Sequence, residues 1–164
     1  MQSNRISSPS RWLLLATVLL AGASFSGCSM FGGPATLNAT VVASAQVNPD
    51  ARKRPSPVVV RVFELKTSTL FEQADFVSLF EKEQAVLGAE LVSREEFVLR
   101  PGETKPLIKP LAPDTKFIGV MVAFRELERA RWRAVVPVAA GKKNVVSIDL
   151  DDINVLAKRT SPKP

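Results

Sequence analysis

The sequence predicts a mainly β fold, an antiparallel β-sandwich with a short helical insertion. Short runs rich in apolar and β-branched residues recur along the chain, and turns containing glycine, proline or asparagine separate them. One stretch, residues 69–87, has helical spacing instead, and strands do not alternate with helices as they do in folds with a parallel sheet. We therefore expect one sandwich domain over residues 35–157.

The first two strands are expected on either side of a proline-rich loop. Residues 36–44 alternate between apolar and polar side chains, which is the pattern of a half-buried strand. Residues 58–65 are dense in β-branched side chains and apolar on both faces except at Arg61 and Glu64, which favours a central strand. Between them, residues 47–57 contain three prolines and a charged cluster, so this segment is expected to be an exposed loop.

Residues 69–87 are expected to form one interrupted helical segment. Thr69 and Glu72 have the spacing of a capping box, Asp75 can cap a second helical start, and Gly88 can end the segment. Three aromatic side chains recur near helical spacing and are expected to pack in the core rather than to line a partner groove. They are Phe71, Phe76 and Phe80.

Five more strand-like segments complete the predicted sandwich. Residues 105–111 are expected at a sheet edge, because Pro106 and Pro110 lack the N–H that a central ladder needs. Residues 117–124 are the most apolar run of the domain and are expected to form a central strand, and Trp132 is expected in the core. The other segments are residues 89–99, which end at a turn over residues 100–103, residues 131–138 and residues 144–150.

The C-terminal residues are expected to leave the sandwich. Residues 149–154 contain three aspartates, but they lack the glycine and the twelfth-position glutamate of a calcium loop. We interpret them as surface acids after a final strand and predict no metal site. Residues 158–164 are expected to fray.

Residues 1–27 have the composition of a cleaved export signal. Arg5 and Arg11 precede an apolar stretch of twelve residues, which is too short to cross a bilayer as a helix, and small residues follow it. Cys28 is the only cysteine and is predicted to carry a covalent lipid, with residues 28–34 as a tether. The alternative is an ordinary secretory leader followed by a free thiol or by a disulfide to another chain.

Composition excludes several kinds of site. The chain has no histidine, which excludes Ser-His-Asp triads, Cys-His dyads and the usual zinc sites. Twenty basic and 16 acidic residues follow the leader, and the basic residues are dispersed except at residues 52–54, so nucleic-acid binding is not supported. Other arginines are expected to form weak surface ion pairs. They are Arg125, Arg131 and Arg133, opposite Glu126, Glu128 and Asp149.

Two parts of the sequence resemble known families. The segment Phe25-Ser26-Gly27-Cys28 resembles the bacterial lipobox, although Phe25 stands where leucine is usual, and Ser29 stands where an aspartate would favour retention at the inner membrane. Segments of the domain, in their order and spacing, resemble the type VI secretion lipoprotein family TssJ, also called VasD. They are residues 58–66 (Val-Val-Val-Arg-Val-Phe-Glu-Leu-Lys), 71–76 (Phe-Glu-Gln-Ala-Asp-Phe) with Leu79 and Phe80, 87–91 (Leu-Gly-Ala-Glu-Leu), 101–103 (Pro-Gly-Glu), 118–125 (Ile-Gly-Val through Ala-Phe-Arg) and 130–133 (Ala-Arg-Trp-Arg).

The resemblance to TssJ implies a transthyretin-like β-sandwich that is anchored in the outer membrane by the lipid on Cys28 and faces the periplasm. It implies a non-enzymatic scaffold that binds the periplasmic C-terminal part of TssM, in a complex with TssL. It implies no cofactor besides the lipid, no nucleic acid and no small-molecule substrate. Partner binding in that family lies in the loop between the first two strands, which is residues 47–57 here. The predicted contacts are Asn48, Pro49, Asp50, Arg52, Lys53, Arg54 and Pro55.

Two alternative functions are less well supported by the sequence. A sandwich that binds a small ligand would need an enclosed apolar pocket with a few convergent polar groups. A cell-wall hydrolase would need two carboxylates on either side of one bond, and Glu95 and Glu96 are the candidate pair. Adjacent residues on a strand point to opposite faces, which disfavours this pair.

Overall fold

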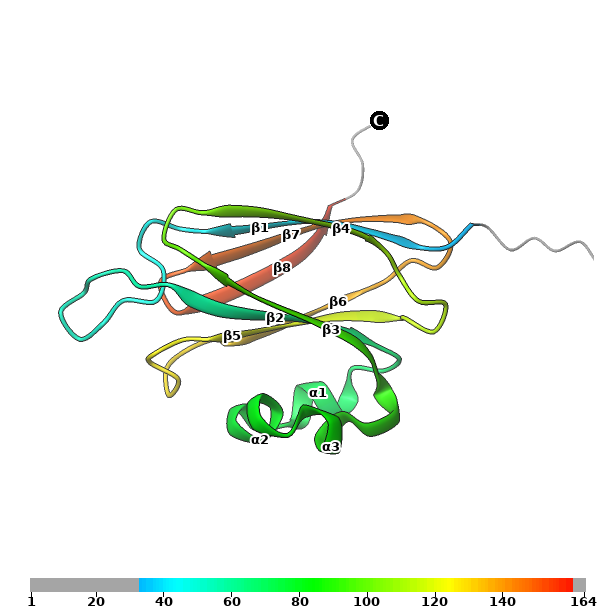
Figure 1. Ribbon diagram of the computed structural model, residues 1–164, viewed down its shortest axis with the longest axis horizontal. Coiled ribbons are helices and arrows are strands. Elements are labelled where there is room, and N and C mark those ends of the chain that lie inside the picture. The colour runs from blue at the N-terminus through cyan, green and yellow to red at the C-terminus, as the bar shows by residue number, and fades with distance from the viewer. Residues whose placement is uncertain (1–32, 161–164) are drawn as a thin grey trace, which may run out of the picture. The chain divides into compact units, whose positions relative to one another are not determined.

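The computed structural model describes residues 33–160, which form two four-stranded β-sheets packed face to face (Figure 1). One sheet has the strand order β4-β1-β7-β8 and the other has the order β3-β2-β5-β6. The predicted mainly β sandwich is confirmed, whereas the predicted signal peptide and Cys28 lie outside the described residues. The strands are β1 (Thr36–Ala43), β2 (Val58–Leu65), β3 (Leu91–Leu99), β4 (Thr104–Pro110), β5 (Phe117–Ala123), β6 (Arg133–Pro137), β7 (Lys143–Asp151) and β8 (Asn154–Thr160).

β1 and β7 pair in parallel, whereas the other neighbouring strands are antiparallel. Thr36 lies opposite Lys143 at the start of the pair, and Ala43 lies opposite Leu150 at its end. The loop that follows β1 and the turn that follows β7 therefore leave the sandwich at the same end. β4, with its two prolines, lies at the edge of its sheet as predicted.

Apolar side chains from both inner faces fill the space between the sheets. The alternation predicted for β1 and β7 is confirmed, because Leu37, Val41, Ile148 and Leu150 are at most 1% exposed. Val60 of β2 packs in the same cluster from the other sheet. The small-ligand alternative requires an enclosed pocket, and the packing of these described residues gives it no support.

One carboxylate is buried beside this core. Glu64 of β2 is 4% exposed and accepts hydrogen bonds from Ser93 Oγ at 2.8 Å and from Thr115 Oγ1 at 2.6 Å. It also accepts one from the backbone N–H of Ala112 at 3.1 Å, and Lys109 Nζ of β4 lies 2.8 Å from its Oε1. Burial raises the pKa of Glu64, but the hydrogen bonds outweigh burial and lower the pKa to about 2. The Glu64–Lys109 pair thus joins the two sheets.

A helical layer covers the outer face of the sheet that contains β2 and β5 (Figure 1). It consists of α1 (Thr69–Gln73), α2 (Phe76–Glu81) and α3 (Glu83–Leu87), followed by a 3-10 turn over Gly88–Glu90. The predicted interrupted helical segment is therefore confirmed. Within residues 33–160 no helix is long and apolar enough to cross a membrane.

Two of the predicted helix ends are confirmed and one is wrong. Asp75 caps α2, because its side chain accepts a hydrogen bond from a backbone N–H of the first turn at 2.9 Å. Gly88 ends α3 with a φ of +50°, a conformation that costs glycine little. The capping box is wrong: Ser68, not Thr69, is the N-cap residue of α1, and its hydroxyl donates to the Glu72 carboxylate at 3.3 Å.

The helices pack on the sheet through a second apolar cluster. Phe71 of α1, Leu79 of α2 and Leu87 of α3 are fully buried, and they pack with Phe63 of β2 and Met121 of β5. Burying a side chain of this size stabilises a fold by about 1.5–3 kcal/mol. The second cluster therefore gives the three short helices the stability that their length alone would not provide.

Aromatic side chains complete the second cluster. The rings of Phe76 and Phe80 stack with centroids 5.5 Å apart, and Trp132 meets Phe76 edge-on at 5.3 Å. Core packing of Phe71 is confirmed, and Trp132 packs partly buried against both clusters. Gly119 gives the Phe71 ring its room, because a Cβ at that position would lie 3.0 Å from Phe71 Cζ.

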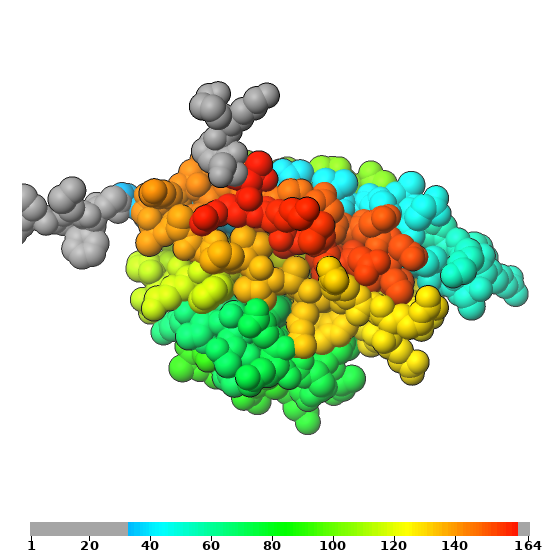
Figure 2. Space-filling view, turned by 180° about the vertical axis from the view of Figure 1, so that it is seen from behind, coloured from blue at the N-terminus to red at the C-terminus, as the bar shows by residue number. Residues whose placement is uncertain are grey.

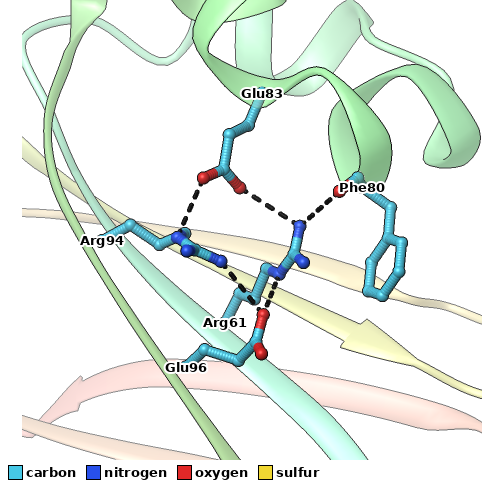
Figure 3. A network of polar contacts seen from close by, with 5 residues as sticks. All are labelled: Arg61, Phe80, Glu83, Arg94 and Glu96. Atoms are coloured by element: carbon cyan, nitrogen blue, oxygen red, sulfur yellow. Dashed lines mark hydrogen bonds and ion pairs between the residues drawn. The ribbon is translucent and has the colours of Figure 1, made fainter.

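A polar network also fastens the helical layer to the sheet (Figure 3). Arg61 of β2, 11% exposed, donates from Nη1 to the carbonyl of Phe80 at 2.6 Å and to Glu83 at 3.1 Å. Its Nε donates to Glu96 of β3 at 2.6 Å, and Arg94 bridges Glu83 and Glu96 at 2.8 and 3.0 Å. Arg61 and Glu96 therefore have structural partners that hold α2 and α3 on the sheet.

β8 is an element that the sequence analysis does not predict. Of the three aspartates of residues 149–154, Asp149 and Asp151 belong to β7, and Asp152, with a φ of +51°, lies in the two-residue turn of the β7–β8 hairpin. The prediction that residues 158–164 fray is wrong at residues 158–160, which belong to β8. Val155 of β8 is fully buried, so the strand contributes to the core.

Candidate functional site

The loop between β1 and β2, residues 47–57, projects beyond the end of both sheets (Figure 1). In the opposite view it forms the protrusion at the right of the molecule (Figure 2). We call this segment the β1–β2 loop. Of the predicted contacts, Asn48 is buried, Pro49 and Asp50 are half-buried, and Arg52, Lys53, Arg54 and Pro55 are exposed.

Asn48 fixes the base of the β1–β2 loop. Its side chain is 3% exposed, and its Nδ2 donates to the carbonyl of Pro57 at 2.7 Å. Its Oδ1 accepts from the backbone N–H of Arg125 at 2.8 Å, and its own N–H donates to the carbonyl of Asp152 at 2.7 Å. Its φ of +51° is one that asparagine tolerates better than most residues. Asn48 therefore holds the loop against the β5–β6 connection and the β7–β8 turn. It is not part of the exposed surface of the loop.

Asp50 closes the tip of the loop. Its Oδ1 accepts hydrogen bonds from the backbone N–H groups of Arg52 at 2.8 Å and Arg54 at 3.0 Å, and its Oδ2 accepts from Arg54 Nε at 2.8 Å. Its N–H donates to the carbonyl of Arg54 at 2.9 Å, and its carbonyl accepts from the N–H of Lys53 at 2.8 Å. The side-chain hydrogen bond from Arg54 is the main cause that lowers the pKa of Asp50 to about 2. The tip is thus folded around one carboxylate.

The loop presents positive charge to solvent. Arg54 pairs with Asp50, its Nη2 lying 2.7 Å from Oδ2. Arg52 and Lys53 are exposed, and neither forms an ion pair with any residue of 33–160. Two cations are therefore available on a backbone that is already ordered, which is an arrangement suited to contact with another protein.

We expect Asp50→Asn to loosen the loop tip and leave the sandwich folded. The amide keeps an acceptor oxygen but loses the negative charge that strengthens the hydrogen bonds from Arg52 and Arg54. Hydrogen exchange of these two amides should accelerate several-fold, while the amide of Val60 in β2 serves as the unchanged reference. Unchanged exchange at Arg52 and Arg54 would show that Asp50 does not hold the tip.

The β1–β2 loop is also one side of a cleft with a volume of about 390 Å³. The β5–β6 connection contributes Arg125, Glu126 and Arg129 to this cleft, and the β7–β8 turn contributes Asp152 and Ile153. Figure 2 shows the loop and the yellow β5–β6 connection at the same end of the sandwich. The sequence analysis misses this cleft, because its three segments meet only in the folded sandwich. The parallel pairing of β1 and β7 brings the β1–β2 loop and the β7–β8 turn to the same end, and the β5–β6 connection joins them from the other sheet.

The arginines of the β5–β6 region do not have the ion pairs predicted for them. Within residues 33–160, neither Arg125, Arg131 nor Arg133 lies in an ion pair. Arg133 Nη1 donates instead to the carbonyls of Phe71 at 3.1 Å and Ala74 at 2.6 Å, which ties β6 to α1. Arg125 and Arg131 are exposed at the end of the sandwich.

Glu95 and Glu96 are not arranged as a catalytic pair. Glu95 Oε1 lies 3.0 Å from Lys109 of the opposite sheet, whereas Glu96 binds Arg61 beneath the helical layer. The two carboxylates point to opposite faces of β3, as their adjacency predicted. Their contacts are those of structural ion pairs.

The sequence and the fold were compared with known proteins. Residues 35–153 match the model of the family described as Type VI secretion lipoprotein, VasD, EvfM, TssJ. No curated protein matches the sequence. Among solved structures, the type VI secretion lipoprotein TssJ1 from Pseudomonas aeruginosa is 33% identical, with a TM-score of 0.76 over 80% of this chain and 99% of that one.

Two further structures are similar at 26% identity. Lip from Serratia marcescens, a membrane-bound component of the type VI secretion system, has a TM-score of 0.68 over 77% of this chain and 97% of that chain. A chain of a type VI membrane complex has a TM-score of 0.64 over 77% of this chain and 98% of its own length. The family match spans the sandwich from its first strand to the β7–β8 turn, and this chain belongs to the TssJ family of type VI secretion lipoproteins.

Proposed function

We propose that this protein is a non-enzymatic scaffold lipoprotein of a type VI secretion membrane complex and that its β1–β2 loop binds the periplasmic C-terminal part of TssM. Family membership supports the place in the secretion system, and the similar chain in a type VI membrane complex supports a role in assembly. TssL completes the proposed complex. The protein holds TssM to the outer membrane and performs no chemistry.

The preorganised β1–β2 loop is the single observation that carries the binding site. Asn48 fixes its base and Asp50 folds its tip, so binding orders few additional backbone groups. A loop that is already ordered binds with a smaller loss of conformational entropy. The exposed Arg52 and Lys53 then provide charge, and arginine is enriched at protein interfaces.

The anchor in this proposal is a covalent lipid on Cys28. Two or three acyl chains hold a protein stably on a membrane, whereas one chain gives marginal binding. The sequence of the lipobox and Ser29 support placement on the periplasmic face of the outer membrane. The lipid anchor then places the sandwich in the periplasm, where it can contact the periplasmic C-terminal part of TssM.

A binding titration tests the proposal. The full chain, extracted in detergent, is titrated with the periplasmic C-terminal part of TssM from the same genome. We expect a Kd of about 1 µM or lower, and a loss of about tenfold or more when residues 51–54 are replaced by Gly-Ser-Gly-Ser.

The control removes positive charge elsewhere. Lys142→Ser/Lys143→Ser lies at the opposite end of the sandwich, where β7 begins beside Thr36. This control should bind as the unchanged protein does, and all three proteins should melt at similar temperatures. Equal affinity of the loop variant and the unchanged protein would exclude the loop as the binding site.

A further inference from the structure

A second hollow lies next to the cleft beside the β1–β2 loop. Arg129 lines both, and the second hollow is formed by the β5–β6 connection, the first residues of β6 and Asn154 of β8. Lys53 and Arg125 line the first hollow, and Arg131 lines the second. We call the two hollows together the end groove.

Positive charge dominates the end groove. Lys53, Arg125, Arg129 and Arg131 are exposed, and none of them has an ion-pair partner among residues 33–160. The groove also contains acids, but Asp50 is already bound by Arg54. The others in the two hollows are Glu126 and Asp152, which leaves an excess of basic side chains.

The groove also has apolar surface between the charges. Trp132 lines the second hollow and is partly buried against both apolar clusters, so its ring is held in place. Ile153 adds apolar area to the first hollow and Ala130 adds apolar area to the second. Tryptophan and arginine are among the residue types that most often contribute the binding energy of protein interfaces.

We infer that the end groove receives an acidic segment of TssM, whose carboxylates meet Lys53, Arg125 and Arg129 and whose apolar side chains pack near Trp132. This inference rests on the proposed function and extends it, because it adds the β5–β6 connection to the β1–β2 loop as a binding element. Complementary charge of this kind raises the association rate and selects the partner, and salt screens it. Asn48 already holds the sides of the first hollow together, because its Oδ1 accepts from the N–H of Arg125 and its own N–H donates to the carbonyl of Asp152.

Charge reversal in the groove tests the inference. The full chain in detergent is titrated with the periplasmic C-terminal part of TssM at about 50 mM and about 300 mM salt. We expect Arg125→Glu/Arg129→Glu to weaken binding about tenfold or more at the lower salt, and the higher salt to weaken the unchanged protein more than the variant.

Lys142→Glu/Lys143→Glu is the matched control, because it makes the same change of charge at the opposite end of the sandwich. It should bind within about twofold of the unchanged protein. The milder Arg125→Gln/Arg129→Gln should show a smaller loss in the same direction, which guards against misfolding of the reversed variant. An Asp→Lys or Glu→Lys change in TssM that restores binding of the reversed variant would identify the acidic segment.

The other outcomes separate the inference from the proposed function. If the loop-tip replacement abolishes binding and Arg125→Glu/Arg129→Glu does not affect it, the inference is wrong and the proposed function stands. If both charge reversals weaken binding equally, the groove has no specific role and the inference is wrong. If the unchanged protein does not bind TssM, the proposed function and the inference both fail.

Discussion

Cys28→Ala is expected to move the protein from the membrane fraction to the soluble periplasmic fraction. Cys28 is the only cysteine of the chain, so no other thiol can accept the lipid. Each buried methylene of an acyl chain contributes about 0.8 kcal/mol, so two or three chains anchor the protein stably, whereas one chain gives marginal binding. Cell fractionation followed by detection of the protein measures the effect.

The neighbouring substitution Ser29→Ala is the control for this experiment. It changes a residue of similar size next to Cys28 and keeps the thiol, so the protein should stay in the membrane fraction. Mass spectrometry of the purified protein should show the mass of the acyl chains on the N-terminal cysteine. A Cys28→Ala protein that remains in the membrane fraction after washing at high salt would contradict the lipid anchor.

Glu64→Gln is expected to lower the free energy of unfolding by about 3 kcal/mol at neutral pH. The pKa of Glu64 is about 2 in the folded protein against an ordinary value of 4.5, so the folded state favours the ionised carboxylate by about this amount. Glutamine removes the charge that Lys109 and Thr115 face and leaves the Lys109 ammonium without its buried partner. Denaturation by urea at pH 7 measures the difference.

The pH dependence gives a second test of the same contact. Because folding lowers the pKa of Glu64, its stabilising effect is complete above about pH 4.5 and is lost as the pH falls toward 2. The unchanged protein should therefore lose stability through this range, and Glu64→Gln should lose less. Glu95→Gln is the control, since Glu95 also contacts Lys109 but its side chain is 40% exposed. Equal stability losses for Glu64→Gln and Glu95→Gln would contradict the assignment.

Strands with a strong local pattern could be predicted from the sequence. β1, β2 and β5 lie where alternation or dense β-branched residues place them, and β4 lies at an edge because of its prolines. The sequence also predicts the helical segment, because Asp75 marks a helix start within it and Gly88 marks its end. These features depend on neighbours in the chain, which a single sequence contains.

Features that depend on distant residues could not be predicted in this way. The sequence does not predict β8, because three aspartates precede this strand and basic residues end it, a composition that is typical of an exposed tail. Its buried face becomes apparent only when it pairs with β7, where Ile148 lies opposite Ala157. The parallel pairing of β1 with β7 is likewise a property of the assembled sheet.

The candidate site was only partly predictable for the same reason. The β1–β2 loop could be located by its prolines and charges, and its basic residues are exposed as expected. The roles of Asn48 and Asp50 could not be predicted, because each role depends on hydrogen bonds that form only in the folded loop. Arg125 and Arg129 become neighbours of that loop only in the folded sandwich.

Site-specific cross-linking in intact cells tests the central claim most directly. A photoreactive amino acid replaces Lys53 at the tip of the β1–β2 loop in one strain and Lys143 at the opposite end of the sandwich in another. Both positions are exposed, and the full lipoprotein is present with its secretion system. We expect a light-dependent adduct with TssM from position 53 and none from position 143. An adduct from position 143 without one from position 53 would place TssM at the other end of the molecule and contradict the account.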